Sequence, residues 1–179
     1  MKTLKKISIL FLATVLSTSI ISCSGDDGGD PSPSPAVEGQ ITANVGGTNF
    51  ASMTMATTAM KVETGGAYTI TIQGSDASGK NLQLILNGVD GEAGTFDIGV
   101  DTAISAIGSY TELNIANPAD SQTWVAPYEN GGVSGSITIS EISDTNIKGT
   151  FTFTARNQEN AQDTKAITGG SFNVNFMQF

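Results

Sequence analysis

The chain of 179 residues contains no histidine, one cysteine, eight basic and 17 acidic residues, and its formal net charge is −9. A serine–histidine–acid triad is therefore excluded, and a single cysteine excludes both an internal disulfide and a multi-thiolate metal site. The acidic balance disfavours nucleic acid as a partner, because like charges repel the phosphates.

The chain begins with the three parts of an export signal. Lysines within residues 2–6 form a basic head, residues 7–21 form an apolar middle, and the small Ser22 precedes Cys23. The apolar run of about 15 residues is shorter than the roughly 20 that a membrane-spanning helix requires. Residues 1–22 are therefore interpreted as a signal peptide that is removed. The alternative is an ordinary secretory signal followed by an incidental cysteine.

The tetrad at residues 20–23, IISC, resembles the lipobox of bacterial lipoproteins. That resemblance implies that the Cys23 thiol carries a diacylglycerol and that its new amino terminus is acylated. One acyl chain binds a membrane only marginally, whereas two or more anchor a protein stably. We therefore expect a lipid-anchored protein whose membrane partner is reached through Cys23.

The stretch after the cysteine, SGDDGGD, resembles the acidic export tag of Bacteroidota surface lipoproteins. Asp26, Asp27 and Asp30 carry this resemblance, which implies an outer-membrane location facing the cell exterior. The alternative is a solvated linker, since runs of like charge are usually that. Glycines and alternating prolines continue to residue 36, so residues 23–36 are interpreted as the acylated cysteine and a flexible tether.

Residues 37–179 are expected to form one all-β domain. Apolar and polar residues alternate with period two, which is typical of strands with one buried face. The clearest segments are residues 40–45, 67–74, 81–88, 135–140, 149–155 and 171–176. About nine or ten mostly antiparallel strands predict a β-sandwich or a partly closed barrel.

Local signals refine this prediction. Gly46 and Gly47 indicate a hairpin turn, because glycine accepts positive φ without strain. Residues 137–155 predict a second hairpin that turns near SDTN. Residues 51–63, ASMTMATTAMKVE, combine helix-forming methionine and alanine with threonine, so a short helix and an irregular strand remain equally open.

Three segments resemble a β-rich domain of unknown function that recurs in Bacteroidota lipoproteins. They are ITANVGGTNFAS near the start of the domain, and IKGTFTFTARN and ITGGSFNVNF near its end. The resemblance implies the fold and the cellular address, and it implies no substrate.

Acidic residues gather in residues 87–101, which are rich in glycine turns. Asp90, Glu92 and Asp97 could supply the oxygens of a calcium site or the paired carboxylates of a hydrolase. The order of a dedicated calcium loop is missing, so exposed turns are the preferred interpretation. We expect no catalytic residue, no cofactor and no dedicated metal site.

Aromatic residues concentrate in residues 109–132, a segment with a loop-like composition. Tyr110, Trp124 and Tyr128 could stack on sugar rings if they were exposed. The alternative is a buried Trp124 that closes one end of the sandwich.

Two further patterns are weak. The triplet DTA at residues 101–103 resembles the O-glycosylation acceptor of exported Bacteroidota proteins, with Thr102 as the acceptor. Outward threonines such as Thr150 and Thr152 are expected simply to be the wet face of strands.

The sequence as a whole predicts a non-enzymatic surface lipoprotein with a binding or structural domain. A carbohydrate-binding accessory module that uses the loop aromatics is the alternative, and a carboxylate-dependent hydrolase is a more remote one. A glycan or an envelope protein is the expected kind of partner.

Overall fold

The computed structural model describes residues 34–100 and 104–178, in which eleven strands account for most of the chain. They are β1 (Gln40–Val45), β2 (Thr48–Ala51), β3 (Thr57–Thr64), β4 (Ala67–Ser75), β5 (Lys80–Val89), β6 (Gly94–Gly99), β7 (Ser105–Glu112), β8 (Gln122–Ala126), β9 (Val133–Ile142), β10 (Asn146–Asn157) and β11 (Thr164–Asn175). Two 3₁₀ turns, η1 (Thr54–Ala56) and η2 (Pro118–Asp120), are the helical elements of these ranges. None of the described helical segments has the length and apolarity needed to span a bilayer.

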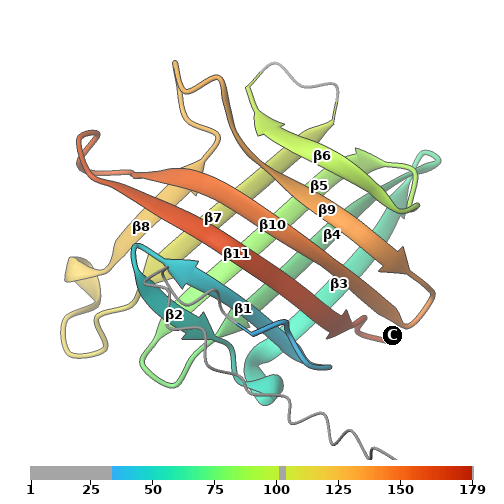
Figure 1. Ribbon diagram of the computed structural model, residues 1–179, viewed down its shortest axis with the longest axis horizontal. Coiled ribbons are helices and arrows are strands. Elements are labelled where there is room, and N and C mark those ends of the chain that lie inside the picture. The colour runs from blue at the N-terminus through green and yellow to red at the C-terminus, as the bar shows by residue number, and fades with distance from the viewer. Residues whose placement is uncertain (1–33, 101–103, 179) are drawn as a thin grey trace, which may run out of the picture.

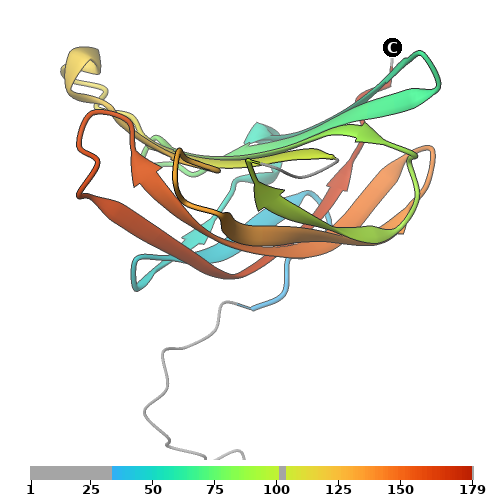
Figure 2. The same cartoon turned by 90° about the horizontal axis from the view of Figure 1, so that it is seen from above.

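The strands form two curved layers, seen face-on in Figure 1 and from above in Figure 2. The front layer has the order β6-β9-β10-β11-β1-β2, and the back layer has the order β8-β7-β5-β4-β3. All pairs of named strands are antiparallel. The expected all-β fold is confirmed, with eleven strands in place of nine or ten.

Strand β10 joins the two layers. Its first part pairs with β9, whereas Arg156 and Asn157 at its end pair with β8. On the opposite side, Ala59 of β3 and Phe176 form an isolated parallel bridge, and the Met177 amide donates to the Ala59 carbonyl at 2.8 Å. The sheet is therefore a curled half-barrel. Its two layers are joined by strand pairing between β10 and β8 on one side and by the Ala59–Phe176 bridge on the other.

The core lies between the layers and is built by the alternation that the sequence displays. The inward-facing apolar residues of the predicted strands are buried at 0–6% relative exposure, among them Leu82, Leu84, Phe151 and Phe153. Fully burying one such side chain stabilises the fold by about 1.5–3 kcal/mol. The period-two pattern therefore predicted the core-facing side of each clear strand correctly.

Both predicted hairpins are present. Gly46 and Gly47 adopt φ values of 56° and 86°, and the Gly47 amide donates to the Asn44 side chain at 2.8 Å. Strands β9 and β10 turn at Ser143, whose amide donates to the Asn146 carbonyl at 2.9 Å. For residues 51–63, the sequence allowed either a short helix or an irregular strand, and the structure has some of each. The single 3₁₀ turn η1 is followed directly by β3.

Candidate functional site

The aromatic segment is not the loop that its composition suggested. Tyr110 lies in β7 and Trp124 in β8, where the two are cross-strand partners with ring centroids 6.0 Å apart. Their exposures are 2% and 4%, and Phe50 packs edge-on against Tyr110. The interpretation of Trp124 as buried is therefore confirmed, and the exposed sugar-stacking alternative is wrong for both residues, because inward alternation along β7 and β8 turns both rings into the core.

A polar network surrounds the Trp124 ring. The Trp124 indole donates to Asp163 Oδ2 at 3.1 Å, and the same oxygen accepts from Asn157 at 3.3 Å. Asn157 also donates to Gln122 Oε1 at 2.8 Å and is itself buried at 3%. A buried amide and a buried indole both need partners, and Asp163 and Gln122 supply them.

Lys165 closes this end of the half-barrel. Its ammonium lies 3.0 Å from Glu112 Oε1 and 4.1 Å from the centroid of the Trp124 ring. The Tyr110 hydroxyl donates to the same Glu112 oxygen at 3.2 Å. Burial, and then the Glu112 charge, raise the pKa of Tyr110, so its phenol stays a neutral hydrogen-bond donor.

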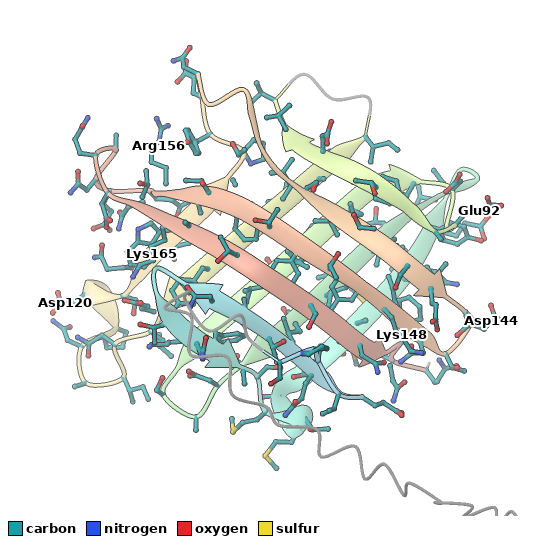
Figure 3. All side chains as sticks on the ribbon, in the orientation of Figure 1. Glu92, Asp120, Asp144, Lys148, Arg156 and Lys165 are labelled. Atoms are coloured by element: carbon teal, nitrogen blue, oxygen red, sulfur yellow. The ribbon has the colours of Figure 1, made fainter. Side chains whose placement is uncertain are left out.

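We name Tyr110, Glu112, Trp124, Asp163 and Lys165 the end cluster. Figure 3 places Lys165 at the end of the molecule opposite Glu92. The Lys165 amine contacts a carboxylate and two aromatic rings, an arrangement that suits a structural role in closing the core better than the role of a nucleophile. No sequence pattern indicated this cluster, because its members come from three strands and a connection far apart in the chain.

Tyr128 stands apart from the end cluster. It follows β8, is half-buried, and has the Arg156 guanidinium 4.6 Å from its ring centroid. A cation over a ring stabilises by about 0.5–1 kcal/mol at an exposed site and covers that ring face. Tyr110, Trp124 and Tyr128 therefore do not form one aromatic platform.

The three carboxylates of the glycine-rich stretch are also dispersed. Asp90 lies in the turn after β5 and accepts the Glu92 amide at 3.1 Å. Glu92 lines an open depression with Glu141 and Ser143, whereas Asp97 lies on β6 opposite Ser136 and is exposed. Within residues 34–100 and 104–178, no group of three or more His, Cys, Asp or Glu side chains that could hold a metal ion is brought together, so Asp90, Glu92 and Asp97 do not gather at one place.

The first described residues are bound to the outer surface of the front layer. The Ser34 carbonyl accepts from the Thr42 hydroxyl at 2.9 Å, and the Ala36 amide donates to Ser171 Oγ at 2.7 Å. Two residues further along the entering chain, the Glu38 carboxylate accepts a hydrogen bond from the Asn175 side-chain amide at 2.9 Å. The described chain therefore enters the domain across β1 and β11.

Five predicted residues lie outside the described part of the chain. They are Cys23, Asp26, Asp27, Asp30 and Thr102. The lipid anchor, the export tag and the glycosylation acceptor remain predictions.

The fold and its sites define an all-β half-barrel domain with a closed polar end. The chain belongs to the family described as domain of unknown function DUF6252, which matches residues 38–174. No curated protein and no solved structure matches the chain.

Proposed function

We propose that the protein is a non-enzymatic lipoprotein of the outer membrane that holds a β-domain at the cell exterior. The observation that carries the proposal is the apolar run that ends in IISC, with the acylated Cys23 as the anchor. Aspartates and prolines then provide a soluble spacer before the domain.

The way the chain enters the domain supports this proposal. The Ser34 carbonyl and the Ala36 amide are held on Thr42 and Ser171, so a pull on the spacer is borne by β1 and β11. These two strands pair along their length in the middle of the front layer. An anchored domain benefits from such an attachment, because a load on an inner strand is shared by neighbours on both sides.

A binding or structural role is preferred to a catalytic one. The most organised group of polar side chains, the end cluster, is internally satisfied and closes the core. The hydrolase alternative needs two carboxylates facing each other in a cleft. Asp90, Glu92 and Asp97 point to separate surroundings.

The carbohydrate-binding alternative loses its original basis. Tyr110 and Trp124 are buried, and Arg156 lies over Tyr128. A glycan partner therefore has to be sought at another surface of the domain.

Fractionation of the producing cells tests the anchor. The Cys23→Ala variant is expected to leave the membrane fraction, whereas the matched Ser24→Ala variant, which keeps the acylated residue, stays with the membranes. Equal membrane retention of Cys23→Ala and the unaltered chain would refute the proposal.

Protease treatment of intact cells tests the exterior location. Replacement of Asp26, Asp27 and Asp30 by asparagine is expected to protect the domain from added protease while the protein remains in the membrane fraction. Undiminished cleavage of this triple variant would show that the acidic residues are only a solvated linker.

A further inference from the structure

One hollow on the outer surface of the front layer lies over β9, β10 and β11. The hollow has a volume of about 390 Å³, within the roughly 300–1,000 Å³ of typical small-ligand sites. It is lined by Pro35, Ser136, Thr138, Thr150, Phe151, Thr152, Gly169, Gly170 and Ser171.

A β-bulge and the exposed Gly169 lie at the hollow. The register of β10 against β11 shifts between Phe151 and Phe153, and Gly170 is the partner of Phe151. Gly170 faces the core, where a Cβ would contact the Phe151 ring, whereas Gly169 is exposed and adopts a φ of 57°. With no side chain at the exposed Gly169, the outer surface of the sheet sinks at this point, whereas the Phe151 ring packs inward against the rings of Phe153 and Phe172.

Hydroxyl groups form the walls, and none of the described lining residues is charged. Three of the hydroxyls are held in place: Thr138 by Thr95 at 2.9 Å, Ser171 by Thr42 at 2.9 Å, and Thr152 by the Ile167 carbonyl at 3.1 Å. The hydroxyls of Ser136 and Thr150 bond to no group within the described residues, although each can both donate and accept.

We propose that this hollow binds a neutral glycan. Sugar hydroxyls can exchange hydrogen bonds with Ser136 and Thr150, while the apolar face of the sugar ring can lie against Pro35. Sulfated or phosphorylated sugars are disfavoured, because no cation lines the hollow and the chain has a net charge of −9.

The surrounding basic residues do not change this selectivity. On the same layer, Lys148 lies 2.8 Å from Glu141, and the Arg156 guanidinium lies over Tyr128. Both cations are therefore already engaged, and the walls of the hollow present only neutral donors and acceptors.

The glycan could come from the cell's own envelope or from outside the cell, and the position of the hollow bears on this choice. Pro35, at its rim, is part of the segment by which the chain enters the domain, so the hollow lies on the face to which the spacer attaches. If the proposed anchor holds, this face is turned toward the cell's own envelope polysaccharide. Binding itself does not depend on the anchor, because every lining residue except Pro35 belongs to the domain.

The experiment measures binding of the full chain, purified in mild detergent, to neutral oligosaccharides by isothermal titration calorimetry. The panel contains gluco-, galacto-, manno- and xylo-oligosaccharides, their sulfated counterparts, and the envelope polysaccharide of the producing cells. We expect at least one neutral glycan to bind and its sulfated counterpart to bind at least about tenfold more weakly. Binding of the envelope polysaccharide alone would identify the cell's own surface as the source, and binding of the oligosaccharides an external one.

Two matched double variants locate the site. Ser136→Ala with Thr150→Val removes two hydroxyls from the hollow, and we expect an affinity loss of about tenfold, because each lost hydrogen bond contributes about 1 kcal/mol. Ser109→Ala with Thr71→Val makes the same chemical changes on the outer face of the back layer and is expected to leave the affinity unchanged.

The proposal is overturned if no neutral glycan binds, if the sulfated forms bind as tightly, or if both double variants weaken binding equally. Should the first double variant fail to fold, as judged by circular dichroism, chemical-shift mapping of the unaltered protein replaces it. Shifts at residues 136–138 and 150–152 support the hollow, and shifts confined to other surfaces refute it.

Discussion

At the scale of single residues, burial decides which charged contacts matter. Lys165 and Lys148 each lie about one hydrogen-bond length from a glutamate, at 3.0 and 2.8 Å. Their side-chain exposures are 24% and 42%, and Lys165 is also covered by the Trp124 ring. Exposed ion pairs contribute little, since water and salt screen them.

Replacing these two lysines in parallel tests this difference. We expect Lys165→Met to lower the free energy of unfolding by roughly 1–2 kcal/mol, because it leaves Glu112 unpaired beside the Tyr110 hydroxyl. The control Lys148→Met should change it by less than about 0.5 kcal/mol. Urea unfolding followed by the fluorescence of Trp124, the single tryptophan, measures both. Equal effects of the two variants would contradict a special role for the end cluster.

Asp76 gives the domain a pH-dependent contact. Burial acts to raise its pKa, but hydrogen bonds from the backbone amides of Lys80 and Ser78 outweigh burial and hold the pKa below its usual value. A carboxylate with a lowered pKa stabilises the fold above its unfolded pKa, and this stabilisation is lost as the pH falls through the folded value.

The Asp76→Asn variant should therefore be less stable than the unaltered chain by about 0.5–1 kcal/mol at pH 7. The difference should shrink as the pH drops below about 4, where the native carboxylate becomes protonated too. Thermal unfolding at several pH values measures it, with the exposed Glu129→Gln as control. A difference that stays constant down to pH 2 would show that charge is not its cause.

At the scale of elements, glycine allows neighbouring strands of the front layer to pack closely. Gly149 in β10 lies where a Cβ would contact both the Thr138 carbonyl of β9 and the ring of Phe172 in β11. Neither neighbour can move freely, because one is backbone and the other is a core side chain. Gly94 in β6 is less constrained, since its nearest neighbour is a ring atom of Phe96 at 3.3 Å.

We accordingly expect Gly149→Ala to cost about 3 kcal/mol or more, or to prevent folding, through overpacking of β9 and β11. Gly94→Ala should cost less than about 1 kcal/mol, because the Phe96 ring can shift slightly. Melting temperatures and soluble yield measure the two. A tolerated alanine at position 149 would mean that β9, β10 and β11 are less tightly packed than described.

At the scale of the whole molecule, the half-barrel is held at two places. β10 joins the layers on one side, and the segment around Phe176 bridges to Ala59 on the other. Phe176 is buried at 6%, and the Lys61 ammonium lies 5.3 Å from its ring centroid. Because every core residue contacts a shared interior, the two layers should unfold together.

The Phe176→Ala variant tests this cooperativity. We expect a loss of about 3–5 kcal/mol, with the circular dichroism and Trp124 fluorescence transitions moving together. Met177→Ala, which changes a half-exposed neighbour, is the control and should have little effect. Separation of the two transitions would show that the layers are independent units.

The sequence by itself determined which side of each clear strand faces the core, because period-two alternation is a local property that any partner layer satisfies. It also indicated the hairpin turns at Gly46–Gly47 and Ser143, where residues three positions apart are hydrogen-bonded, Gly47 to Asn44 and Ser143 to Asn146. It left open whether Tyr110 and Trp124 were buried or in a loop, since the asparagines and the proline between them masked the strands β7 and β8.

Only the tertiary structure decided which distant side chains those strands contact. Trp124 and Asp163 are 39 residues apart, Glu112 and Lys165 are 53 apart, and no local pattern specifies that they come together. The hollow beside Pro35 likewise depends on a register shift between β10 and β11, which is set by how whole strands pair. Local alternation thus determines which faces are buried, whereas strand register determines which distant side chains become neighbours.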